Sequence, residues 1–180
     1  MPEILDAPLT DKGRRQARIL QPAIKSFADQ PQLIALSPNC RALQTGLIAF
    51  EHLIAKNDVP FIAHEMAREE NGVHVCDKRR PTSQQKQEFP QVDFSLLESE
   101  EDIIFRNDRR ETKLEVGERI YRFMEWLFEK RSEEHIGVAS HSGWLLTVFN
   151  GVCTCHNDLK KWFHTGEMRS VKVKVFVQDE

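Results

Sequence analysis

The sequence predicts an α/β protein in which helices cover both faces of a largely parallel sheet, a three-layer α/β/α sandwich. Two observations support this prediction. Short apolar runs at residues 33–37, 61–64 and 136–140 have the length and the bounding turns of buried strands. The stretches between them are long enough for helices and carry helical patterns. Strands that alternate with helices favour a parallel sheet, because each connection places a helix on one face of the sheet.

Hydrophobic spacing and turn residues place the helices. The longest is expected at about 111–131, where apolar side chains recur every three to four residues, at Val116, Ile120, Phe123 and Leu127. A helix at about 10–27 contains Pro22, which should kink or interrupt it. Further helices are expected at about 40–56, directly after His141 and, as a short one, near residues 83–89.

Two other segments have different patterns. Residues 170–177 alternate apolar and polar, as a half-exposed edge strand of the same sheet would. Residues 65–111 are polar and irregular apart from the short helix. The chain has no internal repeat, low-complexity segment or obvious linker, so we expect residues 1–180 to form a single domain.

Composition excludes several classes of function. The net charge of −3 gives no reason to expect nucleic acid as a partner. No apolar run approaches the roughly 20 residues that span a bilayer, so no membrane partner is expected, and the acidic start does not resemble a signal peptide. Four irregularly spaced cysteines favour a reduced, cytoplasmic setting over a disulfide scaffold. No motif indicates the oligomeric state.

The first candidate site residue follows the strand at 33–37. Ligands of parallel sheets bind beyond the carboxyl ends of the strands. Ser37 is a suitable N-cap for the next helix, and Pro38 suits its first turn. Arg41 then lies in that turn, where a cation opposes the helix dipole but is well placed to bind an anion. A solvated arginine is the alternative, and it has equal weight.

A second helix start lies in "PLTDKGRRQA". Thr10 is expected to be the N-cap, and Asp11 offsets the dipole. Gly13 costs about 1 kcal/mol relative to alanine inside a helix. Either close packing or a ligand requires a residue without a side chain at this position, or the glycine is simply tolerated.

His141 lies between the strand at 136–140 and the following helix, in "GVASHSGW". A histidine at a strand end is more often structural than catalytic. Beside Arg41 at the same sheet edge, however, it indicates a phosphate site, because imidazole suits phosphoryl chemistry near neutral pH. Backbone N–H groups at the helix start, where Ser142 lies, would share the charge of the anion.

Three motifs, in this order, carry a family resemblance: "DAPLTDKGRRQA", "ALSPNCRALQT" and "GVASHSG". The chain resembles the histidine phosphatase superfamily, which has the phosphoglycerate mutase-like fold. The segment from "REENGVHVCDKRRPTSQQKQEF" to "EEDIIF" and the later "GEMRSVKV" are similar to the phosphoglycerate mutase-like proteins described from plants. The resemblance covers nearly the whole chain.

The resemblance implies phosphomonoester hydrolysis through a phosphohistidine. His141 matches the family's second histidine, and Arg41 matches its second arginine. Glu69 matches the acid that protonates the leaving group, with Glu70 as its rival. Thr10 and Ser142 complete the expected phosphate-binding residues. The expected ligand is a small phosphorylated molecule or a phosphate ion, and no metal or organic cofactor is implied.

One departure from the family matters for function. The nucleophilic histidine belongs to an Arg-His-Gly motif that ends the family's first, central strand and precedes the equivalent of "DAPLT". No Arg-His-Gly occurs in these 180 residues, and only "MPEIL" precedes Asp6. We therefore expect a chain that is N-terminally truncated relative to the family, either because the sequence is incomplete or because the protein is naturally shorter. It is either a phosphatase whose sequence lacks its start or a non-catalytic protein that binds phosphate or a partner.

Two smaller motifs leave alternatives open. The basic run at Lys78, Arg79 and Arg80 either holds a second negative group or a peptide, or is a solvated loop, which is slightly favoured. Cysteines and histidines in "HVC" (74–76) and "CTCH" (153–156) are types that bind zinc, but their spacing is not that of known finger motifs.

Overall fold

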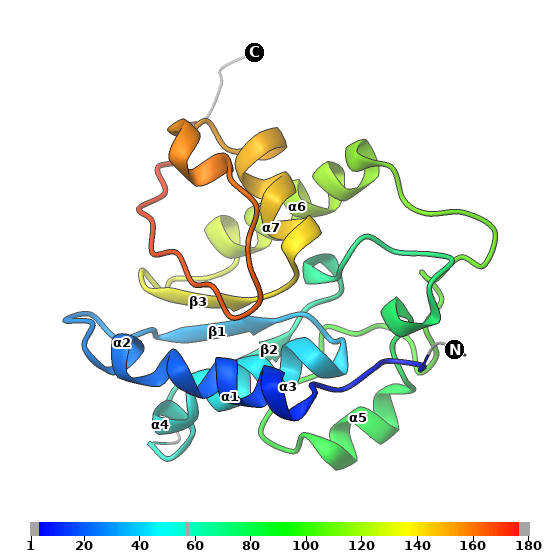
Figure 1. The fold of residues 1–180 in the computed structure, drawn as a ribbon, viewed down its shortest axis with the longest axis horizontal. Helices are drawn as coiled ribbons and strands as arrows, with labels where there is room; N and C mark the ends of the chain where they lie inside the picture. The colour runs from blue at the N-terminus through cyan, green and yellow to red at the C-terminus, as the bar shows by residue number, and fades with distance from the viewer. Residues whose placement is uncertain (1–3, 57, 177–180) are drawn as a thin grey trace.

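The computed structural model describes residues 4–56 and 58–176, which build a parallel sheet in the order β2-β1-β3. The strands are β1 (Leu33–Leu36), β2 (Phe61–Ala63) and β3 (Ile136–Ala139). Both neighbours pair with β1 in parallel (Figure 1). The three apolar runs that the sequence marks as strands therefore lie in one sheet, as predicted.

Helices cover both faces of this sheet. One face carries α1 (Asp11–Ile19), α2 (Gln21–Lys25), α3 (Cys40–Ala49), α4 (Glu51–Ile54) and α5 (Thr82–Glu88), and the other carries α6 (Lys113–Glu129) and α7 (Ser142–Thr147) (Figure 1). The buried side chains of β1 alternate between the two layers. Ile34 and Leu36 join the core on the α3 side, and Leu33 and Ala35 join the core on the α6 side. The three-layer α/β/α prediction is confirmed.

Short helical turns fill part of the connections. They are the 3₁₀ helices η1 (Glu65–Ala67), η2 (Val75–Asp77) and η4 (Asn157–Lys160), and the π-helical turn η3 (Val148–Val152), which continues α7. Among the described residues, no helix is both long and apolar enough to cross a bilayer.

The long helices begin where the sequence predicts. The Thr10 hydroxyl accepts the Gly13 N–H at 3.2 Å and so caps α1, and Thr112 with Glu115 forms a capping box that starts α6. The expected first helix is divided between α1 and α2, with Pro22 in the first turn of α2. The expected helix at 40–56 is likewise divided, at Phe50.

The predicted start of α3 is wrong in one respect. Ser37 does not cap it; Asn39 is the N-cap residue, makes no side-chain capping bond, and Pro38 precedes the helix. The buried carboxylate of Asp6 instead accepts the Cys40 N–H at 2.8 Å. A distant acid thus satisfies the helix start that a local serine was expected to satisfy.

The predicted edge strand at 170–177 is also wrong. Residues 170–176 form no ladder, and residue 177 lies outside the described residues. Phe163 packs on the α6 side of the sheet and Met168 on the α3 side, so the chain crosses the edge of the sheet and does not run along it. Residues 170–176 therefore pair with none of the three strands in the described part of the chain, and Val173 and Val175 stay about half exposed (50% and 52%).

Candidate functional site

The carboxyl ends of β1 and β3 bring two distant segments together. Leu36 pairs with Ala139 in the ladder, so the residues that follow each strand emerge at the same edge. There the Nε2 atom of His141 lies 2.8 Å from the Ser37 hydroxyl, and both side chains are buried. The Ser37 hydroxyl thus contacts His141 and does not cap α3 as the sequence predicts.

The environment of His141 keeps its ring neutral. The residue is only 6% exposed, at the N-cap position of α7. Burial lowers its pKa well below the usual value, and the positive charges of Arg41, Arg68 and Arg119 lower it further. A neutral imidazole offers one N–H donor and one acceptor nitrogen.

Arg41 is the second residue of α3, and its guanidinium is held in place. Its Nη1 atom donates to the Cys76 carbonyl at 2.8 Å, and its Nη2 atom donates to Asp77 Oδ1 at 2.7 Å. Asp77 also accepts from Arg110 Nη1 through its other oxygen, at 2.6 Å. One buried carboxylate therefore orients two guanidinium groups, and Arg41 is not a freely solvated arginine.

Glu69 and Glu70 face different partners. Glu69 Oε2 lies 3.5 Å from the Gly143 amide at the start of α7. A Cβ atom on Gly143 would lie 2.6 Å from Glu69 Oε1, so any larger residue there would require the Glu69 carboxylate to move from this position. Glu70 instead forms ion pairs with Lys113 and, at 3.7 Å, with Arg110.

A cavity of about 290 Å³ joins these groups. It is lined by Arg41, Glu69, Glu70, Asp77, Arg110, Lys113, Ser142, Gly143 and Trp162. Its lining thus has three cationic and three anionic side chains and a single aromatic one.

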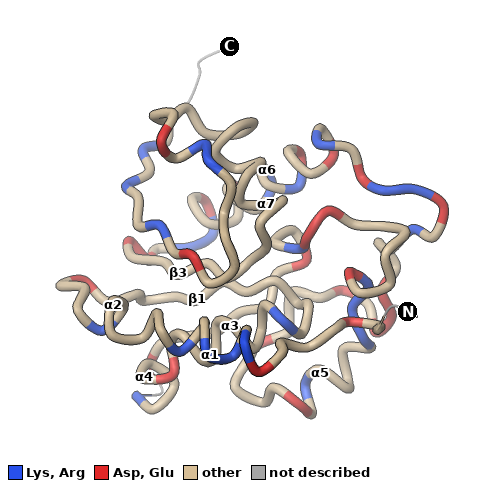
Figure 2. The backbone as a smooth tube through the Cα atoms, viewed as in Figure 1, with Lys and Arg blue, Asp and Glu red and all other residues tan. Residues whose placement is uncertain are grey.

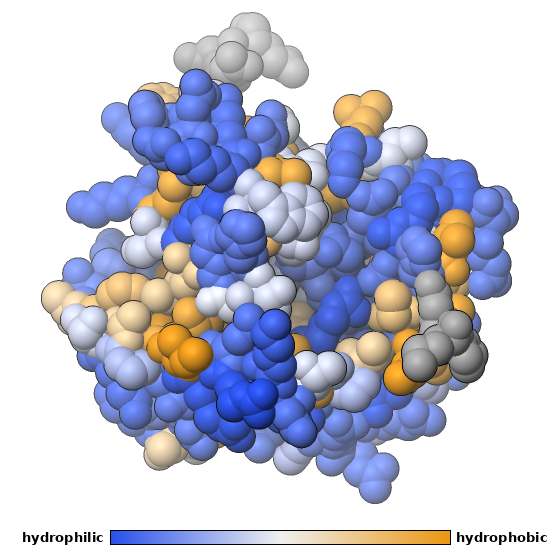
Figure 3. All heavy atoms as spheres, viewed as in Figure 1, coloured by the Kyte–Doolittle hydropathy of each residue, from blue (hydrophilic) through white to orange (hydrophobic). Residues whose placement is uncertain are grey.

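Charged residues are also common outside the cavity. Acidic and basic residues are interspersed along the loop that leads into α6 (Figure 2). Hydrophilic residues cover most of the face of the molecule in Figure 3.

The structure brings some of the predicted site residues together and not others. Arg41, Glu69 and Ser142 line the same cavity, whereas His141, which precedes Ser142 in the chain, is buried and is not among the lining residues. Thr10 does not line it, because its hydroxyl caps α1. Sequence reasoning missed Asp77, Arg110, Lys113 and Trp162, which belong to no motif with a chemical signature.

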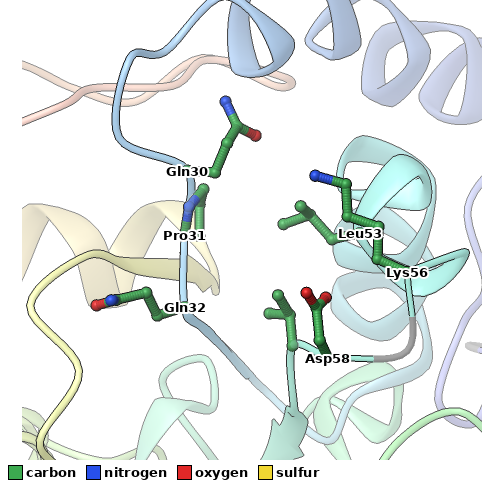
Figure 4. Close-up of a pocket in the computed structure, with 7 residues that line it drawn as sticks. Gln30, Pro31, Gln32, Leu53, Lys56 and Asp58 are labelled. Atoms are coloured by element: carbon green, nitrogen blue, oxygen red, sulfur yellow. The ribbon is translucent and has the colours of Figure 1, made fainter.

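A second cavity, of about 260 Å³, lies beside the amino ends of β1 and β2 (Figure 4). Its lining residues are Gln30, Pro31, Gln32, Leu53, Lys56, Asp58 and Val59. The positive charge of Lys56 and the negative charge of Asp58 balance there, and the described lining residues include no arginine or histidine. Of these two cavities, the one at the carboxyl ends combines guanidinium groups with the start of a helix.

The basic run at 78–80 is mostly structural. Arg79 is only 2% exposed, and its Nε atom donates to Glu65 at 2.6 Å, so both the solvated-loop and the ligand-binding interpretations are wrong for this residue. Arg80 pairs with Asp6 and Glu88, and the Lys78 ammonium lies 5.6 Å from the centre of the Phe105 ring.

The zinc alternative has no cluster to support it. Within residues 4–56 and 58–176, no three histidine, cysteine or acidic side chains are grouped so as to hold a metal ion. The Cys155 thiol contacts the Phe149 carbonyl at 3.3 Å, and His156 Nδ1 lies 3.1 Å from Asp158.

Comparison with known proteins identifies the family. The profile of the histidine phosphatase superfamily (branch 1) matches residues 3–178. "Phosphoglycerate mutase-like protein 1" of Arabidopsis thaliana is 35% identical over 95% of this chain and 71% of its own length. A second Arabidopsis "Phosphoglycerate mutase-like protein" is 30% identical, over 88% and 68%. A "probable phosphatase" of Schizosaccharomyces pombe is 28% identical, over 76% and 62%. The chain therefore belongs to the histidine phosphatase superfamily.

Proposed function

We propose that this chain supplies the phosphate-holding and proton-donating part of a phosphomonoester hydrolase. The observation that carries the proposal is that Arg41, Glu69 and Ser142, from three separate segments, line one cavity beside the buried His141. The substrate class is a small phosphorylated molecule. No cofactor takes part in the proposal.

Arg41 and His141 are the proposed phosphate ligands. A guanidinium has five N–H groups, and the contacts with Cys76 and Asp77 use two of them, so others remain for an anion in the cavity. The neutral His141 ring can donate its one N–H to a phosphoryl oxygen. The backbone of Ser142 and Gly143 at the start of α7 adds donors on the same side.

Glu69 is the proposed acid for the leaving group. Its carboxyl group contacts the start of α7, next to His141, whereas Glu70 is neutralised by Lys113 and Arg110. The ion pairs therefore direct the Glu70 carboxylate towards Lys113 and Arg110, whereas the Glu69 carboxylate is directed towards the start of α7. These contacts favour Glu69 over Glu70.

A second candidate function is phosphate binding without turnover. It is favoured by the lack of an Arg-His-Gly sequence in these 180 residues, which is the motif that carries the nucleophile in the family. His141 is buried and in contact with Ser37, which suits holding an oxyanion better than in-line attack on phosphorus.

Turnover separates the two functions. We expect the 180-residue chain to hydrolyse p-nitrophenyl phosphate no faster than its His141→Ala variant, because loss of a nucleophile costs several orders of magnitude in rate. A version extended upstream through an Arg-His-Gly strand, if the gene encodes one, should be active and form an acid-labile phosphoenzyme. Robust turnover by the short chain that His141→Ala abolishes would show that His141 is itself the nucleophile.

Phosphate binding tests the site itself. Titration calorimetry with orthophosphate should show weak binding that falls at least about tenfold in Arg41→Gln, the loss expected for one charge-assisted contact of about 1.5–3 kcal/mol. Arg122→Gln, which removes an exposed arginine of α6, is the matched control and should bind like the unmodified chain. Equal affinities for all three proteins would refute the proposed site.

A further inference from the structure

Trp162 is an unusual member of the cavity lining. The other eight lining residues are charged or small, and Trp162 is 54% exposed at the edge of the same space. An exposed indole leaves a large apolar surface in water, which burial against a ligand would stabilise. The cavity volume of about 290 Å³ lies near the lower end of small-molecule pockets, about 300–1,000 Å³, so it has room for more than a phosphate ion.

The loop that carries Trp162 is fixed by Arg169. The Arg169 guanidinium donates to the carbonyls of Leu159 at 2.7 Å, Lys161 at 3.0 Å and Trp162 itself at 2.9 Å. The same group lies 3.6 Å from the centre of the Phe163 ring. One side chain therefore holds the turn from residue 159 to residue 169 closed.

Phe163 anchors this loop to the core. It is buried and stacks on Phe149 of η3, with ring centroids 5.7 Å apart and an interplanar angle of 19°. Phe163 is thus directed into the core, whereas its neighbour Trp162 lines the cavity. A surface held in place before binding loses little conformational entropy when a ligand stacks on it.

We infer that Trp162 is a specificity residue that stacks on the organic group of the substrate, and that the substrate is a phosphomonoester whose leaving group carries a planar aromatic ring. Arg169 acts as its positioning residue. The inference rests on the proposed function, since Arg41 and His141 hold the phosphoryl group while Trp162 contacts the rest of the molecule.

Two probes of equal charge test this inference. Phenyl phosphate and methyl phosphate differ in the ring that Trp162 would contact, and titration calorimetry gives both affinities. We expect the unmodified chain to bind phenyl phosphate about fivefold more tightly, the effect of one aromatic pair. Trp162→Ala should abolish that preference while leaving the affinity for orthophosphate unchanged within about twofold, because orthophosphate has no ring to lose. Phe128→Ala, which removes an exposed aromatic ring of α6, is the control and should keep the preference.

A site-specific signal tests the positioning role. With 5-fluorotryptophan in the protein, the ¹⁹F resonance that Trp162→Phe removes should shift with phenyl phosphate and not with methyl phosphate. Arg169→Lys keeps the charge but loses the planar fork, so it should reduce the phenyl preference without changing orthophosphate affinity. No phenyl preference in the unmodified chain, or an equal preference in Trp162→Ala, would overturn the inference. Loss of orthophosphate binding in Arg41→Gln tests the proposed function independently of these results.

Discussion

Two long segments, residues 65–111 and 153–176, contain little regular secondary structure, and they are ordered in different ways. The first lies around buried charges: Arg68 is 1% exposed and Arg79 is 2% exposed. The second lies over the edge of the sheet on two apolar anchors, Phe163 and Met168, and its last described residues are exposed. Buried charges therefore order the first segment, and apolar contacts with the core order the second.

In both segments an arginine binds several backbone carbonyls. Arg79 donates to the carbonyls of Ser99, Glu100 and Glu101, and Arg169 donates to three carbonyls of its own loop. Backbone carbonyls need partners wherever they are withdrawn from water. A guanidinium can satisfy several at once because its five donors lie in one plane.

The two arginines differ in burial and in their acidic partners. The Arg79 guanidinium pairs with Glu65, and the neighbouring Arg68 pairs with Asp102 at 2.5 Å, all in the protein interior. Arg169 pairs with the more accessible Glu167 near the surface. Removal of one partner from a buried pair leaves an unpaired charge in a low dielectric, whereas water screens the remaining partner at a surface.

The largest effect expected from this comparison follows from removal of Arg79. Arg79→Ala should lower the free energy of unfolding by about 3–5 kcal/mol, because Glu65 and the bound carbonyls lose a buried partner. Arg169→Ala should cost only about 1 kcal/mol. Urea unfolding followed by circular dichroism measures both. If Arg79→Ala does not fold, Arg79→Lys, which keeps the charge, should fold with intermediate stability. Equal losses at the two arginines would contradict the distinction.

Much of the fold could be predicted because local patterns determine it. The strands at 33–36 and 136–139 are apolar runs between turns, and the α6 stripe and its capping box are visible in the sequence. The edge strand at 170–177 failed because alternation shows only that a segment could pair, whereas pairing also requires the chain to run along the edge of the sheet, and here it crosses that edge between Phe163 and Met168. The cap of α3 failed because Asp6 lies far from Cys40 in sequence.

The candidate site was predictable only in part, for a similar reason. Arg41 and His141 follow predicted strands, so the topology of a parallel sheet places them at one edge. Asp77, Arg110 and Trp162 reach the cavity from irregular segments, whose paths depend on contacts such as those of Arg68 and Arg169. The prediction for Arg79 was wrong because three consecutive basic residues resemble a solvated loop. Only the tertiary structure shows the backbone carbonyls that accept hydrogen bonds from its buried guanidinium.

A smaller difference between the same two segments should appear in how the free energy of unfolding depends on pH. Burial alone would raise the pKa of Asp102, but the hydrogen bonds and charge of Arg68 outweigh it and lower the pKa. The folded state therefore binds fewer protons than the unfolded state, where an aspartate has a pKa of about 3.9. The stabilisation is complete above that value and is lost as the pH falls towards the folded-state pKa. The free energy of unfolding should thus decline from about pH 5 downward.

Variants at the two acids make this pH dependence specific. Asp102→Asn should start less stable at pH 7 and decline less steeply on acidification, because the group that takes up the proton is gone. Glu167→Gln should leave the slope nearly unchanged: the pKa of Glu167 is also lowered, by the His164 N–H and by Arg169, but solvent reaches this partly exposed carboxylate and screens it. Urea unfolding at half-unit intervals from pH 7 to pH 3 measures the slopes. A Glu167→Gln slope as shallow as that of Asp102→Asn would mean that the surface pair stabilises the chain as much as the buried one.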